Sequence, residues 1–459
     1  MLRDENDDEN YSINAISRCL SLPEIVYEIG SHLLDPGDLC AASQCNRLWN
    51  ETLVPLRMAY PHVNVEYVDS FLEYLKSNEH AAHHCQSLRI IADDAEEEDE
   101  DREPFKPLAD SIWATMQEKL TKSLRGLYIE VHRRHWANIL SSQFTHLTYL
   151  RLFLESDDRE SLPSDFPPQF DPKQALLTFL NQHTGLQTLH LYLGNDYADL
   201  DLSPVFLPTL YSFLLISKAE NVQIQKFLEN HKSLRALDCY TDTEIKPFDA
   251  QVLPNLRALQ VSALTIHWYK ELLAENASRE TPIRHLQISS AQELNFAYVA
   301  QHINPLGSSL RCLELIFWSR DVQLMNVLDH VNELFPQLVE LSLFIPAWGT
   351  EADSEGTKPF ELGPMLEHFA GSKHFRALSV SDPTAAYLSD KLIVDTLKSE
   401  KVPQNLTYII WRAQTFRVMR TDEELVVRKQ YHPRNYRGSQ WKRDWPDEMV
   451  FDHVREDYY

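Results

Sequence analysis

A short apolar phrase recurs along most of the chain and constrains its fold more than any other feature. One apolar residue is followed by a second three positions later and a third two positions after that, as in Leu234, Leu237 and Cys239. The closest copies are 22 to 28 residues apart. This period indicates stacked units that bury a shared core. Twelve copies begin at Leu88, Leu124, Leu147, Leu186, Leu210, Leu234, Leu256, Ile283, Leu310, Leu338, Phe375 and Leu406.

Helical patterns lie between the phrases and complete the repeating unit. In the first phrase, Asp93 falls on the third apolar position, so the pattern is weakest there. A strand followed by a helix in each unit, with right-handed crossovers between parallel strands, predicts a right-handed α/β solenoid. The clearest helical patterns cover residues 173–181, 222–228, 268–274, 322–335 and 392–397.

Three short helices are predicted before the repeats. Ser21 and Glu24 have the spacing of a capping box, so the first helix is expected to begin there. Ile25 and Ile29 lie on one apolar stripe of that helix. Helices of this size bury too little surface to be stable alone. The second and third helices are expected from Asp35 and over residues 47–54.

This stretch resembles an F-box. It begins Leu22-Pro23-Glu24-Ile25, continues through Leu39, and has Cys45, where valine is usual, four residues before Trp49. The resemblance implies docking on the Skp-type adaptor of cullin-based ubiquitin ligases. Alternatively, the helices only cap the repeats and turn their apolar residues inward. The residues that the resemblance assigns to docking, or to the packing behind it, are Leu22, Pro23, Ile25, Ile29, Leu39, Cys45 and Trp49.

The whole chain resembles F-box proteins with leucine-rich repeats, of a kind common in fungi. The Asn or Cys that closes each phrase in that family is mostly absent, so regular curvature is not implied. The resemblance implies an α/β chain in which a small three-helix F-box precedes an irregular leucine-rich-repeat-like solenoid. The expected parts are an acidic N-terminus at 1–18, the F-box at 19–60, the solenoid at 61–430 and a tail at 431–459.

The residues between the phrase leucines predict a binding face. Side chains alternate along a strand, so these residues point to the concave side while the leucines point to the core. Aromatic residues mixed with charge are typical of protein-binding hot spots. Alternatively, several of these rings pack against a neighbouring loop. The predicted target-binding residues are Tyr128, Tyr149, Arg151, Phe153, His190, Tyr192, Asp238 and Tyr240.

Three insertions interrupt the repeat spacing: an acidic run at 93–103, a proline-rich stretch at 155–172, and residues 346–364. Each follows a strand phrase, so all three are expected at one edge of the solenoid, as a binding rim or as tolerated surface loops. Residues 415–419 and 425–429 predict two paired strands that cover the last repeat. The Arg, Tyr and Trp residues over 428–445 suit RNA or an acidic peptide, but the acids that follow favour folding back.

The composition argues against several classes of partner. A net charge of -25 repels nucleic acid and anionic lipid. Six cysteines without a CxxC pair give neither a zinc signature nor a disulfide framework. The acidic start is unlike a signal peptide, and no run of 18 apolar residues occurs. We therefore expect a cytoplasmic or nuclear protein that binds neither nucleic acid nor membrane.

The sequence predicts no enzyme. Phosphate-binding, zinc-protease and nucleophile-elbow motifs are all absent, and only 11 glycines are available for the tight turns that many such sites need. The histidines at 83–84 and 132–135 lack companion ligands. We expect no catalytic residue, cofactor or metal. The predicted function is substrate recognition in a ubiquitin ligase, and the alternative is an interaction scaffold without ubiquitin transfer.

Overall fold

The computed structural model of the chain divides into two compact units, separated in sequence after Tyr197. The first unit holds strands β1 to β5 and the second holds β6 to β15. The structure describes residues 18–32, 36–59, 61–64, 67–91, 110–131, 133–155, 170–241, 251–279, 282–289, 296–317, 324–345, 361–381, 388–399, 401–412, 414–420 and 425–430. The acidic run 93–103, most of the two other predicted insertions, and the tail from 431 lie outside these residues.

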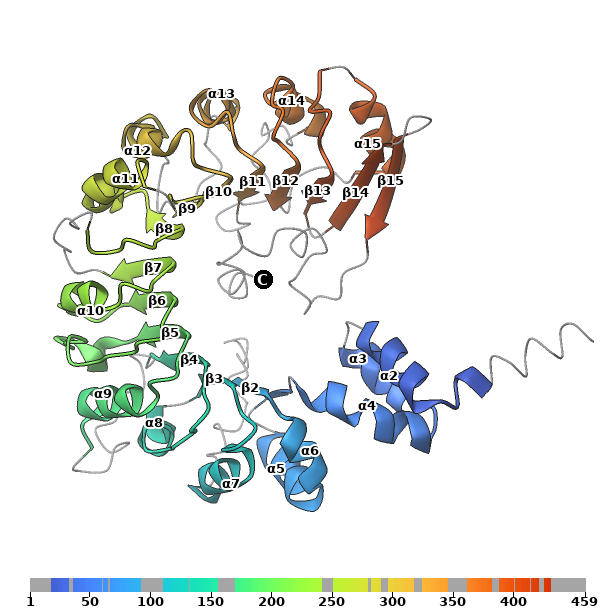
Figure 1. The fold of residues 1–459 in the computed structure, drawn as a ribbon, viewed down its shortest axis with the longest axis vertical. Coiled ribbons are helices and arrows are strands. Elements are labelled where there is room, and N and C mark those ends of the chain that lie inside the picture. The colour runs from blue at the N-terminus through green and yellow to red at the C-terminus, as the bar shows by residue number, and fades with distance from the viewer. Residues whose placement is uncertain are drawn as a thin grey trace, which may run out of the picture. The chain divides into compact units, whose positions relative to one another are not determined.

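The first unit begins with three helices that share a small core. They are α2 (Pro23–His32), α3 (Pro36–Ser43) and α4 (Arg47–Ala59), seen packed together in Figure 1. Gly30 lies so close to Leu53 that a Cβ atom at this position would overlap the leucine side chain. The core between the helices consists of Val26, Leu39 and Leu53, with Ala42, Trp49 and Leu56 packed against it.

Two helix ends differ from the sequence prediction. Ser21 is not the N-cap of α2, since the helix begins at Pro23; its hydroxyl donates to the carbonyl of Arg18 at 2.7 Å. The carbonyl of Leu22 instead accepts the first helical hydrogen bond, from the N–H of Val26. Helix α4 continues through Pro55, past the predicted end at residue 54. Proline removes one helical hydrogen bond there, and burial of residues on the same helix offsets that loss.

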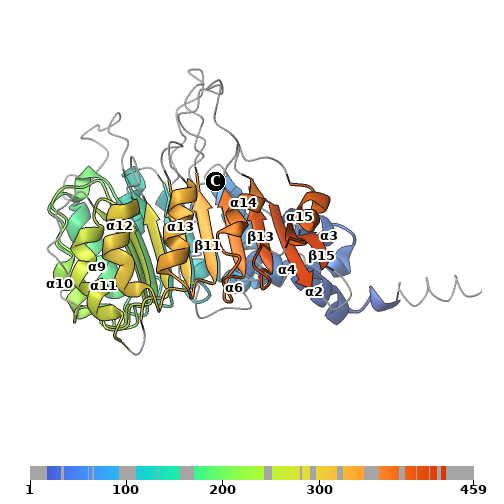
Figure 2. The ribbon, with the colours of Figure 1, turned by 90° about the horizontal axis from the view of Figure 1, so that it is seen from above.

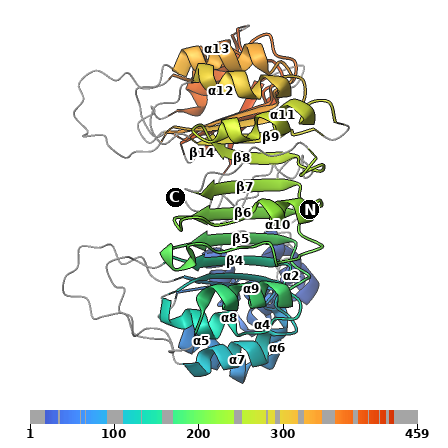
Figure 3. The same cartoon turned by 90° about the vertical axis from the view of Figure 1, so that its left-hand side faces the viewer.

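Five parallel strands form the sheet of the first unit, paired in sequence order. In Figure 3, α8 and α9 lie over one face of β4 and β5. The strands are β1 (His62–Asn64), β2 (Ser87–Ile91), β3 (Gly126–Glu130), β4 (Tyr149–Leu154) and β5 (Thr188–Leu193). The helices are α5 (Val68–Ser77), α6 (Glu79–His84), α7 (Asp110–Leu120), α8 (Trp136–Leu140) and α9 (Pro172–Gln182), with 3-10 turns at Arg133–His135 and Asn195–Tyr197.

The second unit repeats the same arrangement over eight parallel strands. They are β6 (Ser212–Ser217), β7 (Ala236–Thr241), β8 (Ala258–Ser262), β9 (His285–Ser289), β10 (Cys312–Ile316), β11 (Glu340–Phe344), β12 (Ala377–Ser381) and β13 (Tyr408–Trp411). Figure 2 shows α13 and α14 on one side of β11 and β13. A strand followed by a helix in each unit is the architecture of a leucine-rich-repeat-like α/β solenoid.

Helices of the second unit connect these strands. The α-helices are α10 (Gln225–Asn230), α11 (Lys270–Asn276), α12 (Phe296–Ile303), α13 (Leu324–Leu334), α14 (Leu362–Glu367) and α15 (Asp390–Leu397), with 3-10 helices at Ile266–Tyr269 and Asn304–Leu306. Each of the five helices predicted over 173–397 overlaps an observed one. The first half of α14, residues 362–364, and the first residue of α9 occupy positions that the sequence assigned to insertions.

An antiparallel hairpin ends the described sheet of the second unit, as the sequence predicted. Strands β14 (Gln414–Arg420) and β15 (Leu425–Gln430) pair with each other, and β14 pairs with β13. Arg412 adopts a left-handed φ of 54° in the turn between β13 and β14. This hairpin pairs the edge of the last parallel strand, which would otherwise expose a row of free backbone groups.

The first phrase was placed three residues too late. Leu88 pairs with Leu127 in the register of β2 and β3, so it is the second apolar residue of its phrase. The first is Cys85, which is fully buried like Leu88 and Ile90. Asp93 therefore lies outside the phrase, which explains its misfit. Strand β1, which has no such phrase, was missed.

The phrase leucines form the core, as strand alternation predicts. Leu150, Leu152 and Leu154 on β4 are 0 to 1% exposed, and Leu189 and Leu313 are equally buried. Their register partners are leucines of neighbouring strands, so each layer of the core runs from repeat to repeat. Truncating a side chain packed in this way costs about 2 to 5 kcal/mol.

Two buried histidines tie neighbouring repeats together, one in each unit. His183 follows α9, and its Nε2 accepts a hydrogen bond from the N–H of Phe144, while Nδ1 bonds the carbonyl of Phe179 at 2.6 Å. His231 follows α10 and does the same with the N–H of Leu207 and the carbonyl of Phe227. A ring that both accepts and donates is neutral. Burial accordingly lowers the pKa of both histidines.

These histidines predict a pH-dependent stability. The pKa of both histidines is lower in the folded chain than in the unfolded chain, where it is about 6.5. As the pH falls, the unfolded chain therefore binds protons before the folded chain does. The contribution of the two rings to the free energy of unfolding is complete above about pH 6.5 and decreases below it. We expect the double variant His183→Gln, His231→Gln to lose about 1 to 3 kcal/mol per site at pH 7.5. Between pH 7.5 and pH 5.5, the free energy of unfolding should also fall less for this variant than for the wild type.

Urea unfolding at the two pH values measures both effects. The matched control is His146→Gln, at an exposed position, which should behave as the wild type. A double variant that keeps the full pH dependence of the wild type would show that the histidines do not cause it.

Candidate protein-binding surfaces

Helix α2 packs through Val26 and has exposed apolar residues around its start. Val26 is fully buried against α3 and α4. In contrast, Leu22 is 49% exposed and Ile25 is 40% exposed. Leu20, just before the helix, and Tyr27 are also exposed large apolar residues. Apolar side chains grouped in this way on a surface are typical of a site for a protein partner.

The segment before α2 is held in place by α4. The indole N–H of Trp49 donates to the carbonyl of Leu20 at 3.2 Å, and the carbonyl of Cys19 accepts from the N–H of Leu22 at 3.0 Å. These bonds fix the backbone on which the exposed side chains stand. A docking surface that is ordered beforehand loses less conformational entropy on binding.

The structure divides the seven predicted adaptor residues into two groups. Leu22, Pro23, Ile25 and Cys45 are exposed, and Ile29 and Trp49 are half-buried. Leu39 is in the core with Val26, and Trp49 packs against it. The first group is therefore available to a partner, while Leu39 and Trp49 hold the helices together. The sequence pattern did not mark Leu20, Val26 or Tyr27, because α2 packs through Val26 rather than through the predicted stripe.

The predicted target face of the first unit is an aromatic cluster around one arginine. Tyr128, Arg151 and His190 lie in register on β3, β4 and β5. Two positions further along, Phe153 and Tyr192 are also in register. The guanidinium carbon of Arg151 lies 4.6 Å from the ring centre of Tyr128 and 5.0 Å from those of Phe153 and Tyr192. These are cation–π distances.

Rings of this face also contact one another. Phe153 and Tyr192 are stacked, with centres 3.9 Å apart, and Tyr149 meets His190 edge-on at 5.6 Å. The hydroxyl of Tyr128 donates to Glu130, and Arg89 lies over the Tyr128 ring at 4.4 Å. The sequence did not select Arg89, because the first phrase was placed three residues too late; in the observed register Arg89 pairs with Tyr128.

Burial limits which of these residues a partner can reach. Arg151 is fully buried, and Tyr128, His190 and Tyr192 are 2 to 6% exposed. Tyr149 and Phe153 are half-buried. The sequence left open whether the rings bind a target or pack against a loop; the described contacts show that most of them pack against one another and Arg151. Tyr149 and Phe153 are the accessible part of the face.

The other two predicted target residues belong to the second unit. Asp238 and Tyr240 lie on β7, where Asp238 is buried and Tyr240 is 48% exposed. Asp238 is in register with Gln260, Gln287 and Glu314 on β8, β9 and β10. All four are buried. Tyr240 is therefore the most accessible of the predicted target residues.

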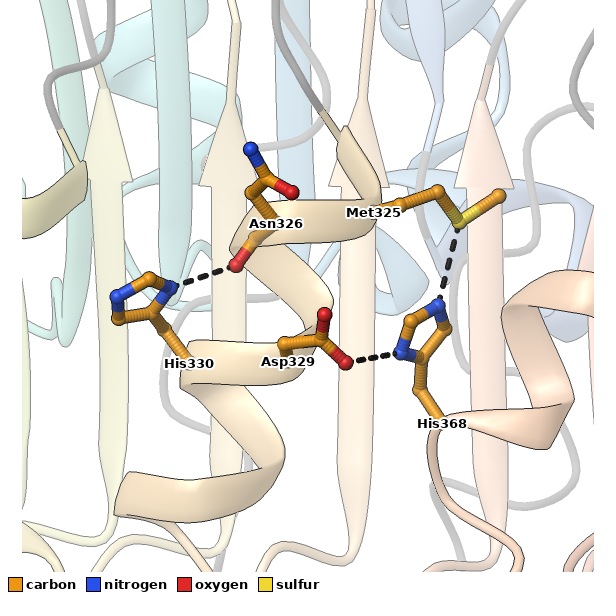
Figure 4. Close-up of polar contacts among 5 residues, drawn as sticks. All are labelled: Met325, Asn326, Asp329, His330 and His368. Carbon is orange, nitrogen blue, oxygen red and sulfur yellow. Dashed lines mark hydrogen bonds and ion pairs between the residues drawn. The ribbon is translucent and has the colours of Figure 1, made fainter.

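Two described groups that could carry acid–base or nucleophilic chemistry, Cys85 and His368, have structural environments. Burial raises the pKa of the Cys85 thiol to about 12, which keeps it protonated and unreactive. In Figure 4, Nδ1 of His368 is 2.7 Å from Asp329 on α13 and Nε2 is 3.3 Å from the sulfur of Met325, so this ring links α13 to the end of α14. Within the described ranges, no cluster of three or more potential metal ligands occurs.

Comparisons with known proteins do not assign the chain to a family. No family model matches the chain, and no curated protein matches it. A solved structure described as the crystal structure of a TLR13–ssRNA13 complex is similar, with 12% identity and a TM-score of 0.32. The match covers 71% of this chain and 49% of that one, so the chain spans about half the length of the protein it matches. Among the described helices, none has the length and hydrophobicity needed to cross a bilayer.

The two kinds of tyrosine on the strand face predict different effects of truncation. Tyr192→Ala removes a buried ring that stacks on Phe153, so we expect a loss of about 3 kcal/mol in the free energy of unfolding. Tyr240→Ala removes an exposed ring and should change it by less than about 0.5 kcal/mol. Urea denaturation followed by circular dichroism measures both. Equal losses would mean that the assignment of buried and exposed rings is wrong.

Proposed function

We propose that this chain is the substrate-recognition subunit of a cullin-based ubiquitin ligase. Its N-terminal helices act as an F-box that docks on a Skp-type adaptor, and the repeats hold a target protein. The observation that carries the proposal is the exposure of Leu22 and Ile25 at the start of α2, a helix that packs through Val26. The alternative, a helical cap that turns these residues inward, does not account for their exposure.

The proposed mechanism is positioning. A target bound to the repeats is kept near the ubiquitin-carrying subunit of the complex, which raises the effective concentration of its lysines. No side chain of this chain then needs to take part in the chemistry. Tyr149, Phe153 and Tyr240 are the proposed contacts for the target, because they combine aromatic character with accessibility.

Adaptor binding can be tested with a double variant at the exposed start of α2. Leu22→Ser, Ile25→Ser should raise the Kd for a purified Skp-type adaptor by roughly a thousandfold, since two hot-spot residues contribute about 2 kcal/mol each. The fold should be unaffected, because both side chains are exposed. Calorimetry with the full chain gives the Kd.

A matched control replaces two exposed leucines of the second unit. Leu264 and Leu392 are 64% and 48% exposed, and Leu264→Ser, Leu392→Ser should leave adaptor binding unchanged. Wild-type affinity in the α2 variant would contradict the proposal. Adaptor binding without ubiquitin transfer to a bound target, in a reconstituted ligase, would favour a scaffold instead.

A further inference from the structure

The ends of the turns that lead into β7 to β13 of the second unit are basic. The four residues before each strand are 232–235, 254–257, 281–284, 308–311, 336–339, 373–376 and 404–407. None of these segments contains an acidic residue, although 68 of the 459 residues of the chain are Asp or Glu, and Glu280 and Glu400 lie shortly before two of them. Their charged residues are Lys232, Arg235, Arg257, Arg284, Arg311, Lys373 and Arg376.

Four of these arginines occupy equivalent positions in consecutive repeats. The carbonyl of Arg235 accepts from the N–H of Arg257 at 2.8 Å, the carbonyl of Arg257 from that of Arg284 at 2.8 Å, and the carbonyl of Arg284 from that of Arg311 at 2.8 Å. Adjacent strands are about 4.8 Å apart. The backbone therefore carries one arginine on each rung, in a row along the edge of the sheet where the strands begin.

Only part of this row has a structural role within the chain. The guanidinium of Arg311 donates to the carbonyls of Ser308, Leu310 and Gln337, and so braces two turns. Arg235 and Arg257 make no side-chain hydrogen bond or ion pair with any residue that the structure describes. Arg235 is exposed and Arg257 is half-buried. Packing of the turns therefore explains Arg311 but not these two.

We infer that Arg235 and Arg257 of this row, together with Lys232 in the same turn as Arg235, bind an acidic, extended segment of a partner protein. Like charges carried by neighbouring strands repel one another, and carboxylates placed along the row relieve that repulsion. Each guanidinium can hold one carboxylate through two parallel hydrogen bonds. The inference says which kind of segment in a target protein is bound. It rests on the proposed function only for the claim that the bound target then receives ubiquitin.

A protein segment fits this row better than nucleic acid does. Proteins that bind single-stranded nucleic acid combine basic grooves with exposed aromatic rings on which the bases stack. Phe335 and Phe375, in or beside these turns, are fully buried, whereas His374 and Tyr211, the rung next to Arg235, are exposed. The turns that end in Arg257, Arg284 and Arg311 contain no aromatic residue, so this part of the row offers charge without a stacking surface.

Fluorescence anisotropy with the full chain tests the inference. The probe is a labelled twelve-residue peptide of alternating Glu and Ser, and the comparisons are a Lys and Ser peptide and a twelve-nucleotide uridine RNA. We expect the wild type to bind the Glu peptide and not the Lys peptide, and more weakly as salt rises. Arg235→Gln, Arg257→Gln should weaken binding about tenfold or more.

The control variant removes the same charge elsewhere on the second unit. Lys226 and Lys270 are exposed and lie outside the row, so Lys226→Gln, Lys270→Gln should change the Kd less than about twofold if contact rather than net charge matters. Failure of the wild type to bind the Glu peptide, equal weakening in both variants, or tighter binding of the RNA would each overturn the inference. Adaptor binding by the Arg235, Arg257 variant should persist, so the two proposals fail separately.

Discussion

Burial of three apolar residues in each repeat is the constraint on which the rest of the structure depends. The period of a strand is two residues, so once Leu150, Leu152 and Leu154 face the core, the residues between them must face the other way. Backbone hydrogen bonds then align each phrase with the next. The aromatic cluster, the buried polar residues of the second unit and the arginine row all follow from this one register.

The sequence predicted most of this fold because the repeat is local and periodic. Eleven phrases, from Leu124 onward, each begin two residues before an observed strand and continue into it, and the final hairpin was also expected. The prediction was wrong where another residue type takes the place of a phrase leucine. Cys85 is apolar in behaviour but is not a leucine, so the phrase at β2 was read from Leu88 instead. The roles of His183 and His231 could not be predicted from the sequence, because the hydrogen bonds that their Nε2 atoms accept come from residues 39 and 24 positions away.

Candidate sites were harder to predict than strands, because accessibility depends on contacts between elements. The pattern placed Ile25 and Ile29 on one stripe of α2, but α4 packs against Val26, which leaves Ile25 outside. The pattern also placed Tyr192 on the strand face correctly and did not reveal that it stacks on Phe153. The side of a strand to which a side chain points follows from backbone alternation, whereas its exposure depends on the residues that pack against it in the folded chain.

Hydrogen–deuterium exchange with and without a Skp-type adaptor tests most directly the claim that the exposed apolar residues around the start of α2 form a docking surface. The account predicts slower exchange of backbone amides over residues 19–31 and 39–50 in the complex. Exchange in the strands that carry the phrases, such as β7 to β13, should be unchanged. Protection of those strands with none in the N-terminal helices would contradict the account, and so would no protection at all at saturating adaptor.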